Sequence, residues 1–143
     1  MQQQAQVTLG GVLAAHNRHD AGGFAALFAH EGVVRTVPTG DAAQGREDVA
    51  AFLAAHFQSF PDSQIERRGV YACAACTWVE WTITGTHAGE FMGHPASHRG
   101  FELHGCSRFT FTGDGLIAED ALYFDPATIL RQLGLTRDDL RVA

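Results

Sequence analysis

The sequence has few basic residues and no long apolar run. Lys and Arg together number 10 against 16 acidic residues, which gives a net charge of −6. A nucleic-acid-binding surface needs concentrated positive charge, so we expect no nucleic-acid partner. No apolar stretch approaches the roughly 20 residues of a membrane span, and residues 1–4 lack the parts of a signal peptide. We therefore expect no membrane partner and a cytoplasmic protein.

Cysteine is also scarce, and its number is odd. Cys73, Cys76 and Cys106 occur in a chain of 143 residues, which is long enough to bury roughly 68–70% of its unfolded surface without covalent links. Three cysteines fit a reducing compartment. The spacing Cys73-Ala74-Ala75-Cys76 lies between two predicted strands rather than at a helix start, which favours packing or a turn over a redox role. With no HExxH pattern either, we expect no metal and no cofactor.

Helical signals dominate the first part of the chain. After a disordered tail over residues 1–6, Thr8 is expected to cap a helix that runs to about Asp20. Asp20 itself can cap a short helix over residues 24–28. Apolar residues recur at three- and four-residue steps from Arg46 to about Ser59, which predicts a third helix.

Strand signals dominate the remainder. A first strand is expected over residues 33–37, and the β-branched and aromatic content predicts four more at 65–71, 77–86, 101–112 and 116–124. Asp125-Pro126-Ala127 has the pattern of an N-cap with proline at the first helical position, so a short helix should follow and end at Gly134. Helices first and strands afterwards, without a linker, predict one α+β domain over residues 1–143 with an antiparallel sheet.

Three segments of this sequence resemble one known family. The segment 85–95 reads GTHAGEFMGHP and is similar to the GTHxGxFxGxP segment of SnoaL-like proteins. Residues 114–119 (DGLIAE), and YFD at 123–125 followed by LRQLG at 130–134, are similar too. The sequence therefore resembles the SnoaL-like polyketide cyclase family of the nuclear transport factor 2-like superfamily.

The resemblance implies both a shape and a chemistry. It implies a cone-shaped, curved antiparallel sheet packed on three N-terminal helices, with an internal apolar pocket and a short C-terminal helix. It also implies a homodimer and acid–base chemistry on small polycyclic or ketone substrates. The family's working pair is a histidine before the last hairpin and an aspartate after it. The matching positions are Ser107 and Leu122, and the isomerase-like base position holds Val37. Because a general base needs a titratable atom, we expect the usual His/Asp pair to be missing.

Two residues are the catalytic candidates. Along residues 101–111, Phe101, Leu103 and Phe109 alternate on one face, which should point at the core and carry Ser107 with it. A serine hydroxyl can donate one hydrogen bond to a ligand oxygen. His87 lies in the segment that carries the resemblance and can reach the pocket mouth; the alternative is that its ring fixes the turn by bonding to nearby backbone.

Further residues are expected around the pocket. His16 and Asn17 end the first helix, which would close the wide end of the cone, and Trp81, Phe109 and Leu122 should face inward. Asp125 is interpreted as a helix cap rather than a catalytic acid.

Two functions remain open from the sequence. The first is an acid–base enzyme, cyclase-like or isomerase-like, acting on a small apolar molecule that bears a ketone or ester oxygen. The second is a non-catalytic ligand-binding or dimerisation module of the same fold. Epoxide hydrolysis finds little support because Leu122 replaces the last-strand aspartate that it would use. A titratable group with a perturbed pKa inside the cavity would separate the first two.

Overall fold

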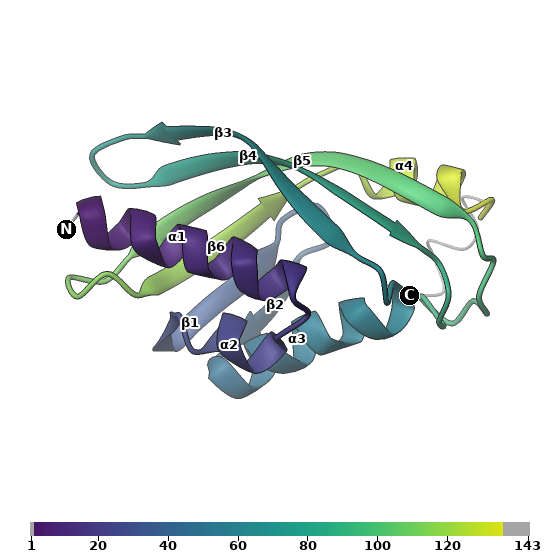
Figure 1. Ribbon diagram of the computed structural model, residues 1–143, viewed down its shortest axis with the longest axis horizontal. Helices are drawn as coiled ribbons and strands as arrows, with labels where there is room; N and C mark the ends of the chain where they lie inside the picture. Colours follow the sequence, from purple (N-terminus) through teal and green to yellow (C-terminus); the bar gives the residue numbers. More distant parts are fainter. Residues whose placement is uncertain (1, 136–143) are drawn as a thin grey trace.

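A computed structural model describes residues 2–135, which form four helices and one six-stranded sheet (Figure 1). The helices are α1 (Gln2–Asn17), α2 (Ala21–Ala25), α3 (Arg46–Ser59) and α4 (Pro126–Gln132). The strands are β1 (Phe28–Thr36), β2 (Asp41–Gln44), β3 (Gln64–Ala72), β4 (Thr77–Thr86), β5 (Gly100–Phe111) and β6 (Ile117–Tyr123). No helix among these combines the length and apolar character needed to cross a membrane.

The sheet is curved and does not close on itself. Its strand order is β2-β1-β6-β5-β4-β3, and the three N-terminal helices lie against one side of it (Figure 1). α1 contacts β3, α3 contacts β1 and β2, and α2 lies between the two helices. The short helix α4 packs on β5. The predicted α+β arrangement of a curved sheet on three N-terminal helices is therefore confirmed.

The sheet is mixed rather than purely antiparallel, which corrects the sequence prediction. β1 pairs with β6 in parallel, whereas all other neighbouring strands are antiparallel. Parallel pairing requires a long connection between the two strands, and here helix α3 and four strands separate them. The sequence also missed β2, because its four residues carry no apolar alternation.

The N-terminus differs from the prediction as well. α1 begins at Gln2, so residues 2–6, expected as part of a disordered tail, are helical. Thr8 lies inside the helix, and its hydroxyl contacts the Gln4 carbonyl at 2.9 Å and the Gly115 carbonyl at 2.7 Å. The hydroxyl thus ties the helix to the β5–β6 turn instead of capping it. The caps predicted at Asp20 and Asp125 are confirmed, since each carboxylate accepts a backbone N–H of its helix. The helix predicted over residues 24–28 was misplaced, because α2 spans Ala21–Ala25 directly after its cap and Phe28 already begins β1.

The GTH segment identified in the sequence fastens a long loop to the end of α3. The backbone N–H groups of Ala88 and Gly89 both donate to the Ser59 carbonyl at 3.1 Å, and the Ser59 hydroxyl donates to the Glu90 carbonyl at 2.6 Å. A Cβ atom on Gly89 would overlap the Gln58 carbonyl oxygen. Glycine is therefore needed here so that the two backbones can approach each other.

Three histidines surround a buried serine where α1, α3 and the start of β3 meet. Ser63 is fully buried, and its Oγ lies 2.7 Å from His56 Nε2 and 3.1 Å from His16 Nε2. His19 Nε2 lies 2.7 Å from the Ser63 carbonyl oxygen. Burial, with neighbouring histidines, lowers the pKa of His16 from 6.5 to about 3 and that of His56 to about 4. Both rings are therefore neutral in the folded protein at ordinary pH.

Replacing Gly89 with alanine should destabilise the fold, because the added methyl group meets backbone that cannot move cheaply. We expect a loss of about 1–3 kcal/mol in the free energy of unfolding, measured by urea titration. Gly10→Ala is the matched control: it lies inside α1 with open space around it and should gain about 0.5–1 kcal/mol. Equal effects of the two substitutions would contradict the close approach at Gly89.

The histidine cluster should make the protein less stable in acid. Below pH 6.5, His16 and His56 are protonated in the unfolded chain but stay neutral in the folded protein. The free energy of unfolding therefore falls as the pH drops from 6.5 towards 4. The loss should be about 2 kcal/mol per histidine near about pH 5. The double variant His16→Gln with His56→Gln should flatten this slope in thermal melts. His30→Gln, at an exposed histidine, should leave it unchanged; an equally flat slope there would refute the assignment.

Candidate active site

One carboxyl group lies buried on the helix-covered face of the sheet. Asp120 is only 4% exposed and faces Phe109 across the β5–β6 pair, while Ser107 faces Leu122. Directly opposed residues of two strands point to the same side, as do alternate residues of one strand. These four side chains therefore lie on the same face of the two neighbouring strands β5 and β6.

Asp120 ends a short chain of buried hydrogen bonds. Trp81 Nε1–H donates to Ser107 Oγ at 2.9 Å, and the Ser107 hydroxyl is hydrogen-bonded to the Asp120 carboxyl. Among the described residues, Asp120 Oδ1 has no partner. Because Ser107 Oγ accepts the indole N–H, the hydroxyl proton of Ser107 is free to be donated to Asp120. One buried carboxyl oxygen is therefore left without a hydrogen bond from the described residues.

The surroundings of Asp120 bring the pKa of its carboxyl group close to neutral pH. Burial raises the pKa of Asp120 from 3.8 to about 7, and the charge of Glu119 acts in the same direction, while the hydrogen bond from Ser107 opposes them. A carboxyl group with such a pKa exists in both protonation states near pH 7. It can therefore accept and return a proton during one reaction, which an ordinary surface aspartate does poorly.

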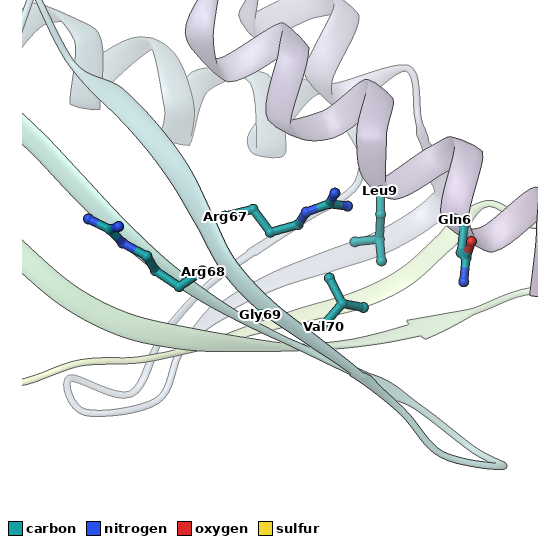
Figure 2. A pocket seen from close by; sticks show the side chains of 6 residues that line it. All are labelled: Gln6, Leu9, Arg67, Arg68, Gly69 and Val70. Atoms are coloured by element: carbon teal, nitrogen blue, oxygen red, sulfur yellow. The ribbon is translucent and has the colours of Figure 1, made fainter.

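A cleft opens between α1 and β3, and its lining does not include Asp120 or Ser107. Its volume is about 550 Å³, and its lining residues are Gln6, Leu9, Arg67, Arg68, Gly69 and Val70. Figure 2 shows Leu9 extending from α1 towards Val70 of β3, with Arg67 and Arg68 pointing in opposite directions. Val70 is in register with Val79, and Val79 with Ser107. The wall of the cleft is thus two strands from Ser107, roughly 10 Å across the sheet.

Four of the residues predicted for the site come together at Asp120. Ser107, Trp81 and Phe109 are buried, and Leu122 is partly buried on the same face. Ser107 is occupied by Trp81 and Asp120, so it positions the carboxyl rather than offering itself to a ligand.

His87 lies elsewhere. It is fully buried in the loop after β4, where its Nδ1 accepts the Ser97 backbone N–H at 3.1 Å and lies 2.8 Å from Ser97 Oγ. Burial lowers its pKa, which keeps the ring neutral. Ser107 faces Val79, eight residues before His87, so the two candidates are separated by roughly 26 Å along the strand. The structure does not bring them into one site.

His16 and Asn17 do not join the site at Asp120 either. His16 belongs to the cluster around Ser63. Asn17 is exposed, and its side-chain amide exchanges two hydrogen bonds with the backbone of Ile65, at 3.0 and 2.7 Å. This residue therefore extends the edge of β3 and holds the end of α1 against it.

Sequence reasoning missed Asp120, although a signal for it was present. Once Leu122 is placed on the inner face, the period of two along a strand puts Asp120 there as well. The resemblance directed attention to Leu122 as the missing aspartate. A carboxyl group two residues earlier on the same face escaped notice.

A metal-dependent site finds no support within residues 2–135, where no group of three or more His, Cys, Asp or Glu side chains is arranged to hold an ion. The histidines around Ser63 point their Nε2 atoms at serine oxygens.

Comparison with known proteins agrees with this architecture. The family model of SnoaL-like polyketide cyclase matches residues 6–133. No curated protein matches the sequence. A protein of Jannaschia sp. CCS1 assigned to the SnoaL-like polyketide cyclases has a TM-score of 0.83 at 18% identity, with 94% of each chain covered.

Two further solved structures are similar. IdmH of Streptomyces antibioticus, assigned as a polyketide cyclase, has a TM-score of 0.75 at 27% identity, covering 92% of this chain and 99% of its own. A hypothetical protein of Catenulispora acidiphila with a ketosteroid isomerase-like fold has a TM-score of 0.79 at 19% identity, covering 92% and 95%. The family match spans nearly the whole chain, and the chain therefore belongs to the SnoaL-like polyketide cyclase family.

Proposed function

We propose that this protein is an acid–base enzyme of the cyclase or isomerase type, in which Asp120 carries the proton. The observation that carries the proposal is the buried Asp120 carboxyl, hydrogen-bonded through Ser107 to Trp81 and with its pKa raised to about 7. A buried carboxyl in this state costs stability, so its presence needs an explanation that packing does not provide. Proton transfer provides one.

The substrate in this proposal is a small, largely apolar molecule with a ketone or ester oxygen. Its route is the cleft between α1 and β3, which Leu9 and Val70 line with apolar surface. Arg67 lies at the same cleft (Figure 2) and supplies positive charge for a polar end of the substrate. The cleft therefore combines apolar side chains with the polar side chains of Gln6, Arg67 and Arg68, and small-molecule sites commonly combine the two.

In the proposed reaction the ionised Asp120 takes a proton from the carbon next to the carbonyl. The electron pair of that C–H bond moves onto the carbonyl oxygen and forms an enolate, whose carbon then attacks a second carbonyl or is protonated at another position. The protonated Asp120 returns its proton to the product. Ser107 orients the carboxyl throughout, because its hydroxyl is fixed by the Trp81 indole.

The proton-transfer step can be tested without the natural substrate. Wild-type protein should catalyse the exchange of α-protons for deuterium in ketone and β-keto ester probes dissolved in D₂O, followed by NMR. The exchange rate should rise with pH through about 7 and then level off, because the carboxylate is the base. Asp120→Asn should lower the plateau by about 10²–10⁴-fold, the usual contribution of a general base.

Glu119→Gln is the matched control for this experiment. Glu119 is the adjacent carboxylate on β6 and forms ion pairs with Arg108 and Arg35, so its loss should change the exchange rate by less than about tenfold. Exchange that survives in Asp120→Asn would exclude Asp120 as the base. Tight binding of probes without any exchange would favour the non-catalytic ligand-binding module instead.

The pKa of Asp120 also predicts how this residue affects stability. The unfolded carboxyl ionises near 3.8 and the folded one near 7, so the folded state holds an extra proton between these values and loses stability as pH rises through them. Above about pH 7 the cost is on the order of 4 kcal/mol. Asp120→Asn, which never ionises, should therefore be more stable than wild type at pH 8 and similar at pH 4 by thermal unfolding. The opposite order at pH 8 would show that the charged form is stabilised by the fold.

A further inference from the structure

We infer that Cys73 and Cys76 form a redox-active dithiol at the tip of the β3–β4 hairpin, which exchanges with low-molecular-weight disulfides to form a reversible intramolecular bond. The pair is the strongest feature outside the site at Asp120. It stands apart from the proposed acid–base chemistry, and neither inference depends on the other.

The hairpin geometry places the two thiols side by side. Tyr71 faces Trp78, and Ala72 faces Thr77, so Cys73 and Cys76 are the next facing positions and close a two-residue turn. The Cys73 N–H donates to the Cys76 carbonyl at 2.8 Å, and the two Sγ atoms lie 2.7 Å apart. Facing residues of a hairpin have Cα atoms close enough for a disulfide without backbone movement.

The two thiols differ in exposure and in proton affinity. Cys73 is exposed and Cys76 is partly buried. A hydrogen bond from the Cys76 thiol lowers the pKa of Cys73, while the same contact raises the pKa of Cys76. The thiolate is the reactive form. Cys73 is therefore the attacking thiol and Cys76 the resolving one.

The exchange proceeds in two balanced steps. The Cys73 thiolate attacks one sulfur of a small disulfide such as oxidised glutathione, forming a mixed disulfide and releasing one thiolate. Cys76 then loses its proton and attacks Cys73 Sγ, which forms the intramolecular bond and releases the second thiolate. The two cysteines are oxidised and the small disulfide is reduced to two thiols. Reduced glutathione in excess reverses both steps.

The surroundings of the pair give the oxidation a structural readout. The Trp78 side chain is hydrogen-bonded to the Cys76 thiol, and its ring lies 5.4 Å from that of Tyr123, between ring centroids. Trp78 and Tyr71 also line a second cleft of about 450 Å³. Oxidation of Cys76 should therefore change the surroundings of Trp78, which belongs both to the aromatic pair with Tyr123 and to the lining of this cleft.

Cys106 supplies an internal control within the same chain. It faces Glu80 across the β4–β5 pair, four residues along β4 from Cys76, which is roughly 13 Å of strand. That separation is too large for a bond to either hairpin cysteine. Burial and the charge of Glu80 also raise the pKa of its thiol, so Cys106 should react slowly.

The test uses the full chain, reduced and then equilibrated in buffers of increasing oxidised-to-reduced glutathione ratio, quenched in acid and alkylated. The peptide that carries residues 73–76 should lose both alkylation sites and the mass of two hydrogen atoms, while Cys106 stays alkylated. Tryptophan fluorescence should change in parallel, and Trp78→Phe should abolish that change without affecting the mass. Free thiols at both positions in the most oxidising buffer would overturn the inference, and so would two separate glutathione adducts.

Single variants test which thiol attacks. Cys76→Ser should accumulate a glutathione adduct on Cys73 several-fold faster than Cys73→Ser accumulates one on Cys76, because Cys73 is exposed whereas Cys76 is partly buried. Cys106→Ser should oxidise like wild type. Thermal unfolding of each variant shows whether the fold is retained, which the turn position at a hairpin tip favours. Faster reaction of Cys76 would contradict the assigned order of the two steps.

Discussion

Burying a carboxyl group in an apolar core is costly unless the group is protonated or hydrogen-bonded, and the candidate site depends on this constraint. Asp120 is buried beneath the sheet with one hydrogen bond from Ser107 and one oxygen without a described partner. Burial raises the pKa of the carboxyl and the single hydrogen bond from Ser107 opposes this, so that the pKa is about 7. Trp81 fixes Ser107, so the state of the carboxyl is determined by three strands at once.

The segments that carry the family resemblance stabilise the fold and do not include the residue proposed to transfer the proton. The GTH segment holds its loop against α3 through Gly89 and Ser59, and His87 is used within that loop to bind Ser97. Asp125 caps α4. These residues build the frame, whereas the proton-carrying group lies in the middle of a strand. Strong similarity in the frame therefore says little about the reaction, in keeping with the general independence of fold and function.

Most of the fold was predictable from the sequence, but the site was predictable only in part. The periods of α3 and of β4 to β6 reflect burial along a single element, which a sequence records directly. The parallel contact of β1 with β6 depends on register between distant segments. Local patterns do not record that register. Asp120 was missed for a different reason: the period of two places it on the inner face with Leu122, but the resemblance pointed to Leu122 alone.

The proposed mechanism requires that Asp120 change its protonation state near neutral pH inside the folded protein. Carbon-13 NMR of the aspartate side-chain carboxyl carbons, assigned with Asp120→Asn, measures this directly. The Asp120 signal should titrate with a midpoint of about 7, well above the ordinary value of 3.8. A midpoint near 4 in the folded protein would show a permanently ionised group and would contradict the proposed acid–base role.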